Sequence, residues 1–276
     1  MAPIVVKIKP IQVAFIIVTT ILSLVAFALG RSLPLAQKFT PIAMIVDNQS
    51  TVMATDKSAQ PTLNFYLMSF CPGSHQLIQS LQPVAKLFGQ KVNFQPHYLF
   101  SQIDNLASYC QQKPLSQRNT CLNENNYLRS TDNLRFGSTN GRSEINENIR
   151  ELCAWTTTND KSLWWQFIKK IDTNCTPANI DSCWSDQAKT AGLDTTKITE
   201  CLNTNGITII KNEITQSSNV TASPQLSING RQLTLQSLQP NTIKETLCSA
   251  FNTPPDICQT VLPTIKTNNT IQNCQL

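Results

Sequence analysis

The sequence predicts an α/β fold in which a small mixed sheet carries helices and is interrupted by a helical, disulfide-rich insertion. One transmembrane helix is predicted to precede this domain at the N-terminus. Three observations predict this arrangement. Strand-like apolar runs lie near both ends of the region 61–252. The polar stretch 101–202 between them contains six of the ten cysteines. Residues 11–30 carry no charge. We therefore expect one domain, 61–252, with its insertion at 101–202.

The N-terminal segment has the length and polarity of a single membrane span. Residues 11–30, at about 1.5 Å rise each, match a hydrocarbon core of about 30 Å. Lys7 and Lys9 lie in a predicted cytoplasmic tail, 1–10, which places the rest of the chain outside the cytoplasm. A cleavable signal peptide ending at the small-x-small run 26–28 is the alternative. Either way a linker, 31–60, leads to a periplasmic or cell-surface domain, anchored or secreted.

The domain begins with a strand, a helix and a second strand. The apolar run Leu63–Met68 ends before Cys71-Pro72-Gly73 and predicts a buried strand. Residues 74–88 repeat apolar side chains at helical spacing, and Pro83 is expected to kink that helix. Residues 91–100 predict a second strand, which Pro96 places at a sheet edge. A right-handed crossover through the helix would make the two strands parallel.

Helical patterns dominate the insertion, and a hairpin follows it. Residues 145–155 and 161–171 are the clearest helices, and Trp164 and Trp165 of the second are expected in the core. Asn229-Gly230 is a strong two-residue hairpin signal. The other predicted elements are a helix at 207–216, hairpin strands at 225–228 and 231–235, a closing helix at 241–251 and a cysteine-containing tail at 253–276.

All ten cysteines follow the uncharged segment, and this even number indicates a set of disulfides formed in an oxidising compartment. No two lie as close together as a zinc ribbon or finger needs, so structural zinc is disfavoured. Local pairing favours four disulfides and leaves Cys71 either free or bonded to Cys274. Ten cysteines allow on the order of 900 pairings, so the sequence alone leaves the question open. The favoured local pairs are Cys110–Cys121, Cys153–Cys201, Cys175–Cys183 and Cys248–Cys258.

Cys71 is the candidate reactive residue because it stands directly after a strand and at the start of a helix. Free backbone N–H groups and the helix dipole stabilise a thiolate at that position. His75 is one helical turn further on, where its protonated form would add to this effect, although an exposed histidine is the simpler alternative. Pro224 lies just before a predicted strand, where proline can adopt the cis form.

Composition argues against several other function classes. Only 14% of residues are charged, and the net charge of +5 forms no basic stripe, so nucleic-acid binding is not expected. Eight glycines are too sparse for a phosphate-cradling loop. No motif for a metal or cofactor is present, and we expect none to be used.

These features resemble the thioredoxin fold, and the large helical insertion resembles its DsbA-type branch. The segments FYLMSFCPGSHQ, EINENIRELCAW, TASPQLSING and LCSAF are similar to exported, cysteine-rich thioredoxin-like proteins. That group includes archaeal and bacterial thiol oxidoreductase-like domains and the lumenal thioredoxin-like domain of plant vacuolar sorting receptors. More distantly, it includes gamma-interferon-inducible lysosomal thiol reductase. The resemblance covers roughly residues 62–260.

The resemblance implies a membrane-anchored thiol–disulfide oxidoreductase, or an isomerase-like enzyme, that acts through a single active-site cysteine, Cys71, as the attacking thiolate. It also implies that Pro224 shapes a substrate groove. Ser74 stands where the superfamily has a second, resolving cysteine, and its hydroxyl is expected to hydrogen-bond Cys71. Expected partners are exported disulfide-containing proteins and a membrane quinone-linked enzyme of the vitamin K epoxide reductase kind. The alternative is a non-catalytic, disulfide-stapled protein- or peptide-binding module, which a Cys71–Cys274 bond that resists mild reductant would favour.

Overall fold

The computed structural model describes residues 56–234, 237–266 and 271–276. The predicted cytoplasmic tail, the predicted transmembrane helix and most of the predicted linker lie outside the described residues. Within the described ranges, no helix is long and apolar enough to cross a membrane. Residues just before the first strand belong to the folded unit, because Ser58 forms a parallel bridge with Phe251 and its N–H donates to the Ala250 carbonyl.

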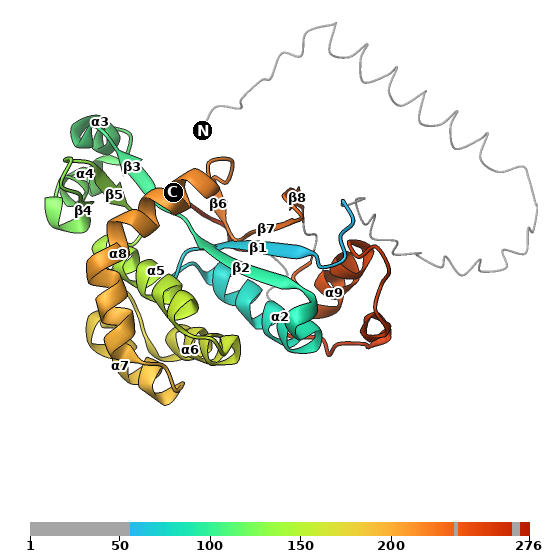
Figure 1. Ribbon diagram of the computed structural model, residues 1–276. Helices are drawn as coiled ribbons and strands as arrows, with labels where there is room; N and C mark the ends of the chain where they lie inside the picture. Colours follow the sequence, from blue (N-terminus) through green and yellow to red (C-terminus); the bar gives the residue numbers. More distant parts are fainter. Residues whose placement is uncertain (1–55, 235–236, 267–270) are drawn as a thin grey trace, which may run out of the picture. The chain divides into compact units, whose positions relative to one another are not determined.

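A four-stranded mixed sheet forms the centre of the domain, in the order β2-β1-β7-β8 (Figure 1). Strand β1 (Thr62–Leu67) pairs in parallel with β2 (Asn93–Tyr98) and antiparallel with β7 (Gln225–Ile228). The predicted hairpin is present, since β7 continues through Asn229 and Gly230, both at positive φ, into β8 (Arg231–Leu233). Pro96 lies in β2 at the sheet edge, as its missing N–H requires.

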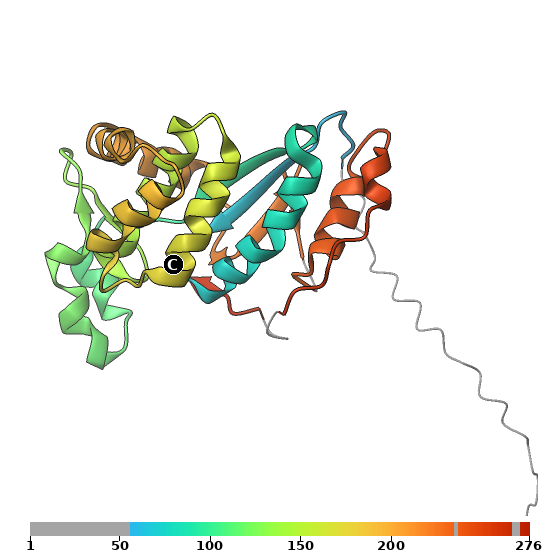
Figure 2. The ribbon, with the colours of Figure 1, turned by 90° about the horizontal axis from the view of Figure 1, so that it is seen from below.

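Helix α2 (Pro72–Phe88) makes the crossover from β1 to β2 and contains Pro83. It lies between α6 (Lys161–Asn174) and α9 (Pro240–Ser249) on one face of the sheet, as Figure 2 shows. Nine of its residues are buried, and they include all six apolar positions that the helical spacing in the sequence predicts. The crossover therefore fixes the N-terminus of α2 at the carboxyl end of β1, which is where Cys71 stands.

The insertion is helical for most of its length but also contains a sheet that the sequence did not predict. Strands β3 (Ser101–Ile103), β5 (Arg135–Gly137) and β4 (Leu128–Arg129) form it, in that order. These strands have two or three residues each, too few to show a period in the sequence. The helices of the insertion are α3 (Leu106–Gln111), α4 (Leu115–Cys121), α5 (Gly141–Thr157), α6, α7 (Ile180–Thr190) and α8 (Thr195–Gln216).

Helix α8 begins twelve residues before the predicted start at 207. Its first half is rich in Thr and Asn, which have modest helix propensity, so the sequence pattern understates it. Tertiary structure supports this half instead. Asp194 caps the helix by accepting hydrogen bonds from the N–H groups of Thr196 and Lys197, and Cys201 is bonded to Cys153 of α5.

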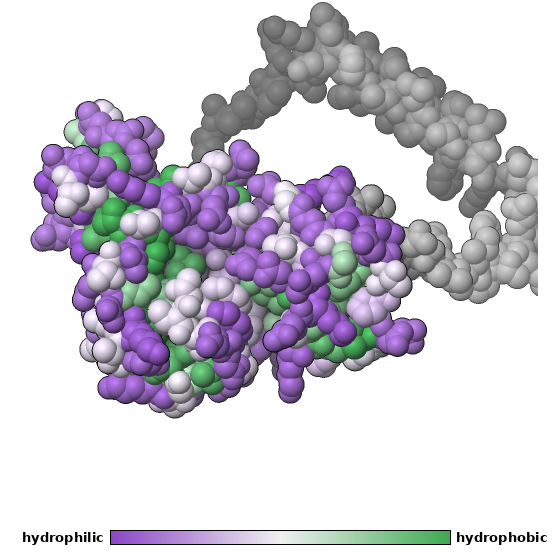
Figure 3. All heavy atoms as spheres, viewed as in Figure 1, coloured by the Kyte–Doolittle hydropathy of each residue, from purple (hydrophilic) through white to green (hydrophobic). Residues whose placement is uncertain are grey.

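The core joins the sheet to the insertion through aromatic side chains. Trp164 and Trp165 of α6 are buried as predicted, and both contact Phe65 of β1, with ring centroids 6.1 and 5.6 Å apart. His97 is also buried, stacked 5.0 Å from Tyr66 and with Nδ1 3.2 Å from a Glu213 carboxylate oxygen. On the face seen in Figure 3, hydrophilic residues dominate and hydrophobic ones show mainly in recessed areas.

Every cysteine in the described part of the chain is in a disulfide. The four local pairs favoured by the sequence are all present, and the remaining bond joins Cys71 to Cys274 across 203 residues of sequence. The alternative in which Cys71 is bonded to the tail is therefore the one found here.

The disulfides of the insertion should stabilise it in proportion to the chain they enclose. The Cys153–Cys201 bond spans 48 residues and the Cys175–Cys183 bond spans 8. Loop-closure entropy then predicts that replacing the first pair with alanines lowers the free energy of unfolding by about 4 kcal/mol, and replacing the second by about 2.5 kcal/mol. Urea unfolding of the two variants measures both losses. Equal losses, or a larger loss for the shorter loop, would contradict the prediction.

Candidate functional site

Cys71 is the N-cap residue of α2, and its position follows from the turn that leaves β1. Its N–H donates to the Met68 carbonyl, 3.0 Å away, and its backbone is extended. Pro72 follows at the first helical position, where a missing N–H leaves nothing unpaired. No acidic residue lies in the first turn. The free N–H groups of this helix end therefore lie at the cysteine, and the first turn itself brings no acidic side chain to them.

The peptide bond between Ser223 and Pro224 is cis, as the sequence suggested. Strand β6 (Ala222–Ser223) precedes it and pairs antiparallel with β9 (Cys274–Gln275), so the C-terminal tail lies along the cis-proline segment. In this ladder Ser223 is opposite Cys274 and Ala222 is opposite Gln275. Nothing in the sequence pattern of the tail predicts this pairing, because β9 has only two residues.

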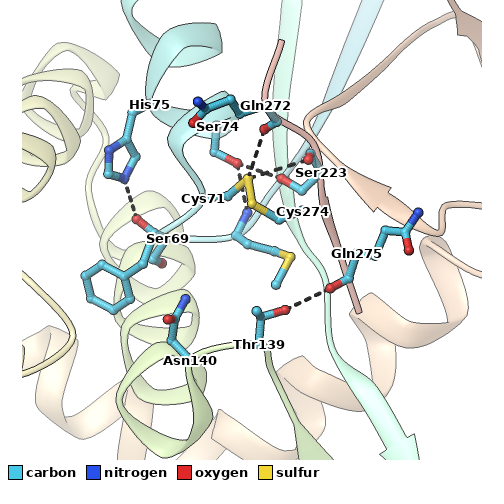
Figure 4. The surroundings of a disulfide bond; sticks show 12 residues. Ser69, Cys71, Ser74, His75, Thr139, Asn140, Ser223, Gln272, Cys274 and Gln275 are labelled. Carbon is cyan, nitrogen blue, oxygen red and sulfur yellow. Dashed lines mark hydrogen bonds between the residues drawn. A yellow bond between two sulfur atoms is a disulfide. The ribbon is translucent and has the colours of Figure 1, made fainter. Parts of the chain in front are cut away.

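The Cys71–Cys274 disulfide lies where the turn, the cis-proline strand and the tail meet (Figure 4). The Cys71 sulfur is 3.5 Å from the Ser223 carbonyl oxygen and 3.6 Å from that of Gln272. Cys71 itself is 1% exposed, whereas Cys274 is only partly buried. A thiol from another molecule therefore reaches the Cys274 sulfur more readily than that of Cys71.

Ser74 joins two parts of the site instead of bonding to the sulfur. Its hydroxyl is 2.6 Å from the hydroxyl of Ser223 and accepts a hydrogen bond from the N–H of Met68 at 3.2 Å. It is 2% exposed. The partners of this hydroxyl are therefore Ser223 and Met68, and the expected hydrogen bond to Cys71 is not among those the structure gives it. Ser74 connects the end of β1, the start of α2 and the cis-proline strand.

Gly73 permits the close approach of the tail and the cis-proline. A β-carbon at this position would lie 2.2 Å from the carbonyl oxygen of Gln272 and 2.6 Å from Cδ of Pro224. Neither neighbour is the end of a flexible side chain, so a larger residue displaces backbone. No sequence pattern assigned a role to Gly73. The sequence signal that could have pointed to it was its position in the motif, between Cys71-Pro72 and Ser74.

His75 lies beside the turn and points away from the disulfide (Figure 4). Its Nε2 is 2.7 Å from the Ser69 carbonyl oxygen and 3.2 Å from Oδ1 of Asp172 in α6. The expected role of His75 as a direct partner of the Cys71 thiolate is therefore not supported by its contacts. It joins the turn to α6.

Asp172 is an unexpected titratable group next to the turn. Its side chain is 9% exposed, and Oδ2 has no hydrogen-bond partner. Burial raises the pKa of this carboxyl from 3.8 to about 7, against the opposing effect of His75. Sequence patterns do not reveal this, because Asp172 looks like an ordinary polar residue near a helix end.

A buried polar stripe on α5 holds the turn before Cys71. The Asn148 side-chain oxygen accepts from the N–H and the hydroxyl of Ser69 at 2.9 and 2.6 Å. Oε1 of Glu144 accepts from the N–H of Phe70 at 3.1 Å. One turn beyond Asn148, Glu151 accepts from the hydroxyl of Tyr98. The signal for this stripe was the i, i+4, i+7 spacing of polar residues in EINENIREL, on a helix otherwise expected to bury apolar ones.

Two buried carboxyl groups on α5 have strongly perturbed acidities. Burial raises the pKa of Glu147 to about 7, partly offset by Arg150. Burial also raises the pKa of Glu151, and the neighbouring Glu147 raises it further. Each has one carboxylate oxygen without a hydrogen-bond partner. No group of His, Cys, Asp or Glu side chains among the described residues is arranged to hold a metal ion.

Replacing Gly73 with alanine should weaken the Cys71–Cys274 bond. The added methyl group meets the tail backbone and Pro224, and overpacking of this kind costs about 1–3 kcal/mol, so the bond should be reduced about tenfold more readily. Thiol labelling and mass spectrometry at fixed dithiol concentration measure this. Gly206→Ala is the matched control, because its nearest neighbour would be 3.6 Å away. Equal behaviour of the two variants would show that the close approach does not matter.

The raised pKa of Asp172 should make folding stability depend on pH. Between about pH 4 and pH 7 the folded protein holds this proton and the unfolded chain does not, so stability falls as pH rises through that window. Asp172→Asn should reduce the loss between pH 5 and pH 8 by about 2–3 kcal/mol. Urea unfolding at the two pH values measures it, with the exposed Asp256→Asn as a control of equal charge. An unchanged pH dependence in Asp172→Asn would refute the assignment.

Sequence comparison matches residues 65–248 to the vacuolar sorting receptor thioredoxin-like domain. Vacuolar-sorting receptor 2 of Arabidopsis thaliana is 26% identical over 230 residues, which cover 74% of this chain and 35% of the receptor. Vacuolar-sorting receptor 7 of the same plant is 24% identical over 267 residues, covering 86% of this chain and 41% of the receptor. The chain thus spans well under half the length of these relatives.

Structure comparison finds similar bacterial proteins at low identity. The reduced form of the disulfide bond oxidoreductase DsbG from Mycobacterium tuberculosis has a TM-score of 0.46 and 16% identity, covering 75% of this chain and 88% of that one. Oxidised BdbD from Bacillus subtilis has a TM-score of 0.43 and 12% identity, covering 71% and 91%.

The sequence match extends over more than half of the chain, and it includes β1, the Cys71 turn, the insertion and the cis-proline hairpin. This chain therefore belongs to the family of the vacuolar sorting receptor thioredoxin-like domain.

Proposed function

We propose that this protein is an extracytoplasmic thiol–disulfide oxidoreductase whose redox centre is the Cys71–Cys274 pair. The observation that carries the proposal is the bond between a helix-N-terminal cysteine and a cysteine of the tail, beside a cis-proline. Five disulfides favour an oxidising compartment. Residues 11–30 would anchor the domain to the membrane.

Cys274 supplies the second thiol that the Cys71-Pro72-Gly73-Ser74 motif lacks. In a dithiol motif the resolving cysteine lies one helical turn after the first. Here Ser74 occupies that place. A serine has no thiol and cannot resolve a mixed disulfide, and its hydroxyl is hydrogen-bonded to that of Ser223. A cysteine on the tail can perform the same exchange because it already lies in bonding contact with Cys71.

From the oxidised state, the exchange begins at the more exposed sulfur. A substrate thiolate attacks Cys274, the Cys71–Cys274 bond breaks, and the electron pair leaves with the Cys71 thiolate. The helix N-terminus stabilises this leaving group. The second substrate thiolate then attacks the substrate sulfur of the mixed disulfide and releases the thiolate of Cys274, which takes up a proton. The substrate has lost two electrons and gained a disulfide, and Cys71 and Cys274 are reduced.

This balance requires a substrate with two thiols and an acceptor of two electrons, and the resemblance to DsbA-type proteins suggests the class of each. The substrates are exported proteins with pairs of cysteines. A membrane quinone-linked thiol oxidoreductase is the class of enzyme that would accept the two electrons and restore the disulfide. An anchor at residues 11–30 would keep the domain near such a membrane enzyme.

A non-catalytic binding module is the second candidate, and the family match favours it. The matched relatives are named as sorting receptors, and 1% exposure of Cys71 suits a structural disulfide. In that case the fold would present a peptide-binding surface, and the five bonds would serve only stability.

The two candidates differ in how the five disulfides respond to mild reductant. We expect limiting dithiothreitol to open Cys71–Cys274 well before the other four, as thiol labelling and peptide mapping would show. Cys71→Ser, which leaves the more exposed Cys274 without its partner, should then accumulate mixed disulfides with oxidised substrate proteins. Cys71→Ser/Cys274→Ser should accumulate none. Replacing Cys175 and Cys183 with alanines is the control and should leave trapping unchanged.

Two results would favour the binding module instead. One is a Cys71–Cys274 bond that resists reduction as strongly as Cys153–Cys201. The other is equal trapping by Cys71→Ser and by the double variant, because trapping would then be independent of Cys274.

A further inference from the structure

The tail segment 271–276 covers an apolar surface beside the disulfide. The buried residues of this surface belong to β1, its following turn and the segments after β2 and α8. Cys274 and Leu276 are the tail residues packed against them. The surface consists of Tyr66, Met68, Cys71, Leu99 and Val220.

Inward- and outward-facing residues are distinct along this segment. Ile271, Cys274 and Leu276 are partly buried, while Gln272, Asn273 and Gln275 are exposed. Ile271 packs against the main core and Leu276 against the apolar surface, on either side of the disulfide. The contacts that depend on side-chain type are therefore made by two apolar residues. One lies three positions before the cysteine, and the other lies two positions after it.

The other contacts of the tail use its backbone. Strand β9 adds to β6 as an antiparallel neighbour, and the Gln275 carbonyl accepts from the hydroxyl of Thr139 at 2.9 Å. The Gln272 carbonyl lies over Gly73, where a side chain would exclude it. Backbone contacts of this kind accept any extended peptide in the same register.

A small cavity next to Ile271 leaves room for a different side chain. It has a volume of about 160 Å³ and opens beside Pro224. Its other apolar lining comes from Leu77, Leu226, Leu233 and Leu238. An apolar residue larger than isoleucine at that position of a bound peptide could fill it.

We propose that segment 271–276 is a tethered competitor that occupies a peptide-binding surface, and that the partner is an extended segment of another protein with the same pattern. That pattern is an apolar residue, two residues of any kind, a cysteine, one residue of any kind and a second apolar residue. The inference rests on the proposed function for the role of the cysteine, but occupation of the surface by the tail does not require redox turnover.

Docking of the tail is tested without the disulfide in Cys274→Ser, which leaves Cys71 as a lone thiol. If the tail still covers the site, iodoacetamide alkylates Cys71 slowly. Adding Leu276→Asp should release the tail and speed alkylation about tenfold, because the leucine loses its apolar contact. Adding Gln275→Glu places the same charge on an exposed neighbour and should leave the rate within about twofold. Circular dichroism confirms that each variant is folded.

The partner pattern is tested with two synthetic peptides. One has the sequence of residues 271–276 with serine in place of the cysteine, and the other also has aspartate in place of both apolar residues. In Cys274→Ser/Leu276→Asp, the first should protect Cys71 from iodoacetamide at millimolar concentration and the second should not. Protection by both or by neither would overturn the proposed pattern.

The outcomes separate this inference from the proposed function. If Leu276→Asp and Gln275→Glu alkylate at the same rate, the tail is not a competitor, whatever the redox behaviour of the pair. If the tail and the peptide protect Cys71 but no mixed disulfide with a substrate protein forms, the surface binds peptides and the oxidoreductase proposal fails alone.

Discussion

The site depends on how the turn between β1 and α2 satisfies its backbone. The N–H groups of Ser69 and Phe70 lie beyond the last ladder bond of β1 and before the first helical bond of α2, and a buried N–H without a partner costs about 1–3 kcal/mol. Asn148 and Glu144 of α5 accept both hydrogen bonds. The insertion therefore builds the site as well as enlarging the core, because it supplies the side chains that fix the residue before Cys71.

The same arrangement explains the perturbed acids. Holding the turn with buried polar side chains of α5 brings Glu147 and Glu151 into the interior, close to Asp172 of α6. Burial disfavours the ionised form of all three carboxyl groups, the charges of Glu147 and Asp172 further disfavour ionisation of Glu151, and one oxygen of each group lacks a partner. The neutral forms relieve these penalties. The domain should thus be most stable below neutral pH. The groups responsible are Glu147, Glu151 and Asp172, and none of them contacts the disulfide itself.

The sequence predicted the central sheet and the four local disulfide pairs, left the state of Cys71 open, and missed most of the contacts that shape the site. Apolar periodicity located β1 and α2, and Asn229-Gly230 located the β7–β8 hairpin, because these signals are local. The pairing of β9 with β6 depends on chain segments 50 residues apart, and a two-residue strand carries no periodic signal. For Gly73 the motif was visible, but the need for glycine comes from the Gln272 carbonyl, which only the folded tail brings there.

With the redox centre proposed above, placing the second cysteine on the tail would tie redox chemistry to binding. In a dithiol motif the two sulfurs are neighbours on one helix, so little chain entropy is lost when they join. Here the bond closes a loop of 203 residues, although the Cys248–Cys258 disulfide and the contacts of Gln239 with Ile265 hold the tail close to α9. The remaining entropy loss is offset by docking of residues 271–276. A peptide that took their place, as proposed above, would remove that support and favour opening of the bond, so occupancy of the surface and the redox state of the pair would be thermodynamically linked.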